Sequence, residues 1–98
     1  MYSLRLLYER IGEGVVVGDM IHFACVGYRL KVYECTVNDS LTFYSGVAYL
    51  TTTEETLQLL SMDKDLVLEL GGGERFSFEF SNVTLGKITI RFKKRWKS

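Results

Sequence analysis

Two segments on either side of three consecutive glycines constrain the fold more than any other part of the chain. They are LVLEL (66–70) and RFSFEF (75–80), and in the second one phenylalanines alternate strictly with polar residues. This period of two is typical of a β-strand with one buried face. A three-residue hairpin loop, or a five-residue loop with the same parity, matches apolar with apolar residues across the two strands. The register that follows from the glycine loop pairs Leu70 with Glu74, Glu69 with Arg75, Leu68 with Phe76 and Leu66 with Phe78.

Glycine-rich loops can also bind phosphate, and such loops lie between a strand and the N-terminus of a helix. Here a strand pattern follows Gly73, and no Gly-Lys-Ser or Gly-Lys-Thr is present. The sequence therefore predicts a hairpin turn, in which glycine is needed because such loops contain positive φ angles.

The rest of the chain also indicates a sheet, and it contains no proline, which would remove hydrogen-bond donors from strands. Further strands are expected at 3–10, 15–26 with a bulge at Gly18, 28–37, 41–50 with a break or bulge at Gly46, and 87–96. IGEG (11–14), Gly27, 38–40 and 81–86 are expected to interrupt them. In 28–37 the apolar alternation becomes irregular at the C-terminal end.

One helix is expected near 52–62, since Thr51-x-x-Glu54 and Thr52-x-x-Glu55 both fit a capping box. The predicted fold is α+β, in a single domain over 1–98. It is mainly an antiparallel sheet of six or seven strands, which can curl into a partial barrel, with this one short helix.

Composition excludes several classes of function. The chain has 12 basic and 12 acidic residues. Arg5, Glu9 and Arg10 interrupt the N-terminal apolar stretch, so we expect no secretory signal. We also expect no membrane span, because no apolar run is long enough, and a cytoplasmic location. One histidine, His22, and two cysteines, Cys25 and Cys35, are too few for a structural zinc site. We expect no metal, no cofactor and no catalytic site.

Charge is distributed unevenly, because all 12 acidic residues lie in 1–86 and half of the basic ones lie in 87–98. An expected binding surface on the last strand consists of Lys87, Arg91, Lys93, Arg95, Trp96 and Lys97. Cations at a period of two beside an aromatic ring can follow a phosphate backbone and stack a base. The same residues can instead protect an exposed sheet edge from aggregation, or dock an acidic protein.

The function that the sequence favours is a small non-enzymatic protein-binding module of inhibitor, immunity or adaptor type. Its partner would be another protein, or a second copy of the chain in a homodimer. The six tyrosines are suitable contact residues for either partner. Nucleic-acid binding through 87–97 is one alternative, and a small-ligand-binding barrel is another. The segment LTTTEETLQLL, followed by closing strands that end in Lys-Arg-Trp, resembles the layout of some small bacterial toxin-immunity proteins over 41–96. That resemblance assigns no role to any residue.

Overall fold

The computed structural model describes residues 2–20, 23–38 and 41–92. Six antiparallel strands and one short helix make up this part of the chain, which confirms the predicted α+β fold. In chain order they are β1 (Tyr2–Val17), β2 (Ala24–Val37), β3 (Leu41–Thr51), α1 (Glu54–Ser61), β4 (Val67–Leu70), β5 (Arg75–Asn82) and β6 (Lys87–Arg91).

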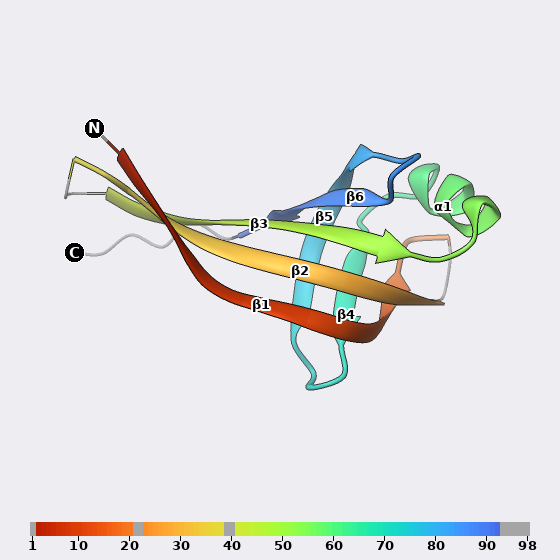
Figure 1. Ribbon diagram of the computed structural model, residues 1–98. Coiled ribbons are helices and arrows are strands. Elements are labelled where there is room, and N and C mark those ends of the chain that lie inside the picture. The colour runs from red at the N-terminus through yellow and green to blue at the C-terminus, as the bar shows by residue number, and fades with distance from the viewer. Residues whose placement is uncertain (1, 21–22, 39–40, 93–98) are drawn as a thin grey trace.

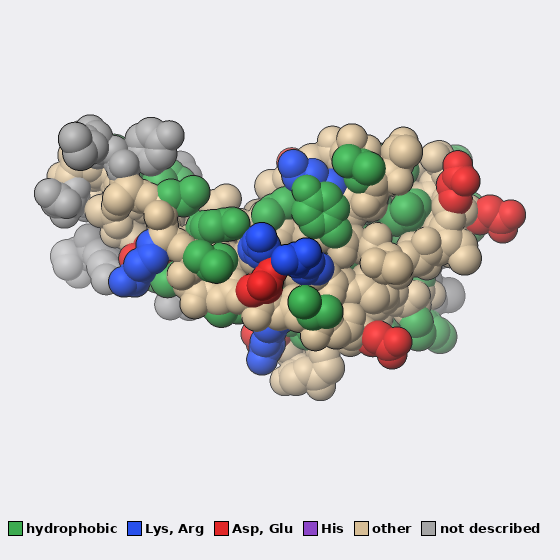
Figure 2. All heavy atoms as spheres, viewed as in Figure 1, with side chains coloured by type: hydrophobic (Ala, Val, Ile, Leu, Met, Phe, Trp, Pro, Cys, Tyr) green, Lys and Arg blue, Asp and Glu red, His purple; other side chains and the backbone are tan. Residues whose placement is uncertain are grey.

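The six strands close into a ring in the order β1-β2-β3-β6-β5-β4, because β4 pairs back onto the end of β1 (Figure 1). The first three strands and the last three each follow one another as neighbours, and α1 connects the two groups. β1, β2 and β3 are much longer than the others, so they continue beyond the ring. The molecule is consequently elongated, with extents of 43 × 25 × 22 Å (Figure 2).

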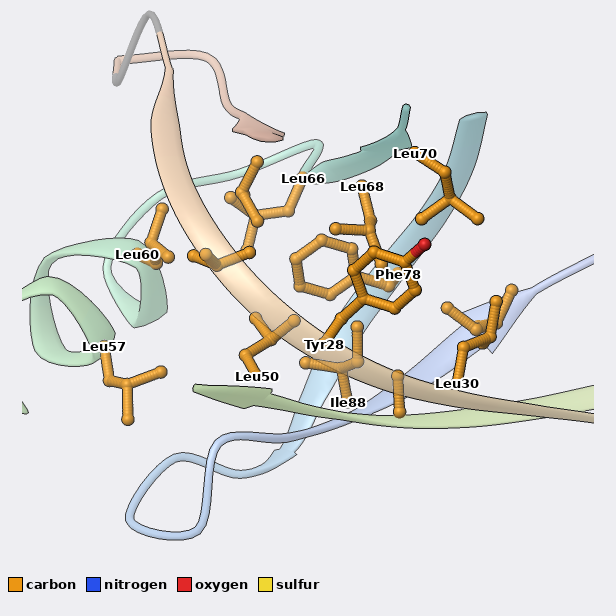
Figure 3. Close-up of a cluster of buried hydrophobic side chains, with 14 of the residues drawn as sticks. Tyr28, Leu30, Leu50, Leu57, Leu60, Leu66, Leu68, Leu70, Phe78 and Ile88 are labelled. Atoms are coloured by element: carbon orange, nitrogen blue, oxygen red, sulfur yellow. The ribbon is translucent and has the colours of Figure 1, made fainter. Parts of the chain in front are cut away.

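The interior of the ring is filled by apolar side chains (Figure 3). Alternate residues of each strand point inward, among them Leu30 of β2, Leu68 of β4 and Ile88 of β6, which are completely buried. Helix α1 covers one end of the ring with Leu57 and Leu60. No charged or polar residue is buried in the described ranges, so the core is held together by apolar packing.

The glycine hairpin has the predicted register. Leu68 pairs with Phe76 and Glu69 with Arg75, and the Leu70 amide donates to the Glu74 carbonyl at 2.8 Å. Gly73 has a φ of 91°, which explains the need for glycine at this turn. The paired side chains of Glu69 and Arg75 form an ion pair of 2.8 Å on the outer face.

The expected turn at 11–14 is wrong, because β1 runs without interruption from Tyr2 to Val17. Its glycines serve close packing inside the ring. A Cβ on Gly12 would lie 3.2 Å from the Tyr28 hydroxyl, and one on Gly14 would lie 2.6 Å from the Glu69 carbonyl oxygen. The chain turns after Val17 instead, so the single strand expected over 15–26, with a bulge at Gly18, is also wrong.

Two further glycines expected to interrupt strands do not do so. β2 passes through Gly27, and β3 passes through Gly46 without a register shift. At Gly46 the space of a side chain is taken by Ile90 of β6, whose Cβ would lie 2.9 Å from an added Cβ.

The helix and the last strand differ in their bounds from the expectation. Thr53 caps α1, since its hydroxyl accepts from the Thr56 amide at 3.2 Å, so neither Thr51 nor Thr52 is the cap. β6 ends at Arg91, and the remainder of the strand expected over 87–96 reaches into 93–96, outside the described residues.

Candidate protein-interaction surface

Three strands of the sheet extend beyond the ring. β6 pairs with β3 only from Gly46 to Tyr49, and β4 pairs with β1 only from Gly14 to Val17. Beyond these pairs the three long strands have only each other as neighbours among the described residues. We call the extension, residues 2–6, 33–37 and 41–45, the wing (Figure 1).

The apolar side of the sheet changes face where the wing begins. In the ring, β2 directs Tyr28, Leu30 and Val32 inward, and all three are buried. The next apolar residues, Tyr33, Cys35 and Val37, come one position later and therefore point to the outer face. In β1 the same change coincides with a register shift between Leu6 and Tyr8, because a bulge alters which face the following residues occupy.

The outer side of the wing is consequently apolar. Strand pairing sets Leu4 beside Cys35 and Phe43, and Leu6 beside Tyr33 and Ser45, and directly paired residues share one face. We call the following residues the wing face: Leu4, Leu6, Tyr33, Cys35, Val37, Leu41 and Phe43.

Large side chains of the wing face are open to solvent. Leu4 is 58% exposed, Leu6 50%, Leu41 48% and Phe43 43%, whereas Cys35 between them is buried. Figure 2 shows hydrophobic side chains on the visible surface where the long strands leave the ring. A sheet normally buries its apolar face against another layer, and within the described chain no layer covers this one.

The opposite side of the wing is polar and has its own partners. Arg5 of β1 forms an ion pair of 3.1 Å with Glu34 of β2. Nearer the ring, Tyr44 contacts the ring of Phe92, with centroids 6.2 Å apart. The wing is therefore an amphipathic sheet whose apolar side faces outward.

Charged residues cross the outer face at the base of the wing. Glu9 lies 2.9 Å from Arg29 and 3.9 Å from Lys31. Glu9 forms an ion pair with both cations, so this row of one acid and two bases has a formal net charge of +1 and marks the boundary of the wing face.

The basic surface expected on the last strand is only partly within the described residues. Lys87 and Arg91 lie on the outer side of β6, with Ile88 and Ile90 buried on the other side. Arg91 is ion-paired with Glu79 of β5. Lys93, Arg95, Trp96 and Lys97 lie outside the described residues, so the structure does not place this surface as a whole.

Few features of the described residues suit a small ligand. Side chains fill the ring, and the hollow beside α1 and β5 is an open depression of about 660 Å³ whose lining includes Asp63, Ser77 and Glu79. In the described ranges no three histidine, cysteine or acidic residues gather as a metal site, and His22 lies outside them. Cys25 and Cys35 are ten residues apart on one strand, or about 33 Å, and both are free thiols.

No helix in 2–20, 23–38 or 41–92 is long and apolar enough to span a membrane. Comparison with protein families, with curated proteins and with solved structures finds no match. The resemblance to immunity proteins gains no support from these comparisons, and the wing face is defined by geometry alone.

Proposed function

We propose that this chain is a small non-enzymatic protein-binding module, and that it binds its partner through the wing face. One observation carries the proposal, namely that large apolar side chains project outward from the wing at exposures of 43–58%. In the neighbouring ring most residues of these types lie on the inner side, and Ile11 and Tyr49 are the large apolar residues beside Arg29 that are exposed on its outer side.

The size and shape of the wing face suit a macromolecular partner. Three strands about 4.8 Å apart and five residues long, at about 3.4 Å per residue, give a flat area of roughly 250 Å². The largest exposed apolar patch of a typical soluble protein is about 300–600 Å² and is often functional, and the wing face approaches this size. Tyr33 and Phe43 add aromatic contact area, which is enriched at protein interfaces.

The filled interior of the ring supports the same conclusion. A ring whose core is occupied by Leu30, Leu68 and Ile88 leaves function to the outer surface. An inhibitor, an immunity protein or an adaptor acts through such a surface. Of the basic surface expected for nucleic-acid binding, the described residues include Lys87 and Arg91, and Arg91 is paired with Glu79.

Site-specific photo-crosslinking in cells tests the proposal. A photoreactive phenylalanine analogue replaces Phe43 on the wing face in one variant. In a control it replaces Leu85, which is 60% exposed in the loop between β5 and β6. We expect a discrete adduct from position 43, none from position 85, and loss of the adduct when Leu4→Glu is added. Equal adducts at both positions, or none at position 43, would overturn the proposal.

A further inference from the structure

We infer that the partner of the wing face is a second copy of this chain, packed wing against wing about a two-fold axis. The inference rests on the proposed function and names the partner for the same surface. It follows from the charge, the symmetry and the area of the wing face.

Charge is the first argument. The wing face contains no aspartate, glutamate, lysine, arginine or histidine, and in the charged row beside it Glu9 forms ion pairs with Arg29 and Lys31 of the same chain. A different protein is usually selected by complementary charge, and like charges exclude wrong partners. A face without charge provides no such selection. It can pack against its own copy without repulsion, which is what an isologous interface requires.

Symmetry is the second argument, and it fixes the orientation. The charged row of Glu9, Arg29 and Lys31 crosses the outer face where the wing meets the ring. If both wings pointed the same way, each copy would place this row against the other copy and desolvate it. An end-over-end arrangement sets the tip of one wing over the base of the other, and the rings then lie at opposite ends. The contact is limited to the uncharged rows, with the row of Leu4, Cys35 and Phe43 at the centre.

Area is the third argument, and it predicts the strength of the dimer. A stable interface buries about 800 Å² of accessible surface on each partner. The flat area of the wing face is roughly 250 Å², so wing contact alone gives a reversible dimer. We expect a monomer near 1 μM and a dimer in the range of about 100 μM to 1 mM, since small interfaces lie at the weak end of the affinity scale.

Analytical ultracentrifugation between about 1 μM and about 1 mM, the range that such a weak dimer should span, measures the association. In the test variants Leu4→Glu and Phe43→Glu we expect the dimer Kd to rise by about thirtyfold or more, the factor for loss of a central contact residue. In the matched control Leu85→Glu, with the same substitution at a similarly exposed leucine, we expect no change. Ser45→Arg provides a second test on the wing that changes no apolar residue, in case a glutamate variant does not fold.

The outcomes separate the two proposals. A chain that stays monomeric to about 1 mM, while Phe43 still crosslinks to a different protein, overturns the second-copy inference and leaves the protein-binding proposal standing. A monomer without any wing adduct overturns both. A dimer that is weakened by Leu85→Glu or Met62→Glu, but not by the wing variants, also overturns the inference, because it would use another exposed apolar residue.

Discussion

Replacing Gly14 by alanine tests how the ring closes between β1 and β4. Gly14 pairs with Leu70 at the start of the short contact between these strands. A Cβ at this position would lie 2.6 Å from the backbone carbonyl oxygen of Glu69. That oxygen belongs to the strand backbone, so it cannot rotate away as the end of a flexible side chain can, and β4 must shift.

The magnitude follows from two opposing terms. Forcing an extra carbon into a packed site costs about 1–3 kcal/mol. Alanine also restricts the unfolded chain, which contributes about 0.4–1 kcal/mol in the other direction. We expect the free energy of unfolding to fall by about 1–2 kcal/mol. For a domain of this size that corresponds to a decrease in Tm of roughly 4–16 °C.

Thermal and urea denaturation followed by circular dichroism measure the effect, with Gly71→Ala as the matched control. A Cβ on Gly71 meets nothing within 4 Å, so the control should equal the wild type or exceed it by up to about 1 kcal/mol. If Gly14→Ala were as stable as Gly71→Ala, the close approach of β4 to β1 could not be the reason for glycine in the middle of this strand.

Two pairs of substitutions test the helix cap and the core, and one titration tests the basic C-terminal segment. Thr53→Ala should lower the free energy of unfolding by about 1 kcal/mol and Thr52→Ala by almost nothing, since Thr53 is the residue that caps α1. Equal losses of stability in urea denaturation would contradict this assignment. Leu68→Ala should cost about 2–5 kcal/mol, whereas the exposed Leu85→Ala should stay within about 0.5 kcal/mol, and a small effect at Leu68 would contradict the described core. Titration with single-stranded oligonucleotide should leave Trp96 fluorescence unchanged, whereas saturable quenching that weakens between about 50 and 200 mM salt would favour nucleic-acid binding.

The parts of the fold that depend on residues close together in the chain are predictable from the sequence. The alternation in 75–80 and the glycines at 71–73 determine the hairpin register, since the two strands are adjacent in the chain. Glycine also occurs at Gly12 and Gly14, where the turn predicted from it is wrong. Turn glycines are required by local φ angles, but these two are required by Tyr28 and by β4, which approach from other strands. A sequence without its strand order does not distinguish these two causes.

The sequence pattern gives only a weak indication of the wing. The irregular alternation at the end of 28–37 marks the position where apolar residues move from the inner to the outer face of β2. This change of face can be interpreted only when it is known that the pairing of β6 with β3 ends at Gly46. The two strands are far apart in the chain, so their pairing is not evident from the sequence. The sequence alone therefore points to the basic segment 87–97 as a binding surface, and most of the residues named for that surface lie outside the described part of the chain.

The central claim is that the wing face is buried by association, and methyl NMR on dilution tests it most directly. Spectra of leucine methyl groups would be compared between about 1 mM and about 10 μM, a range that spans the concentrations at which the weak dimer is expected to form. We expect the methyl signals of Leu4, Leu6 and Leu41 to shift together with concentration, while those of Leu85 stay fixed. Wing signals that do not change over this range would contradict the claim that a second copy covers the wing face.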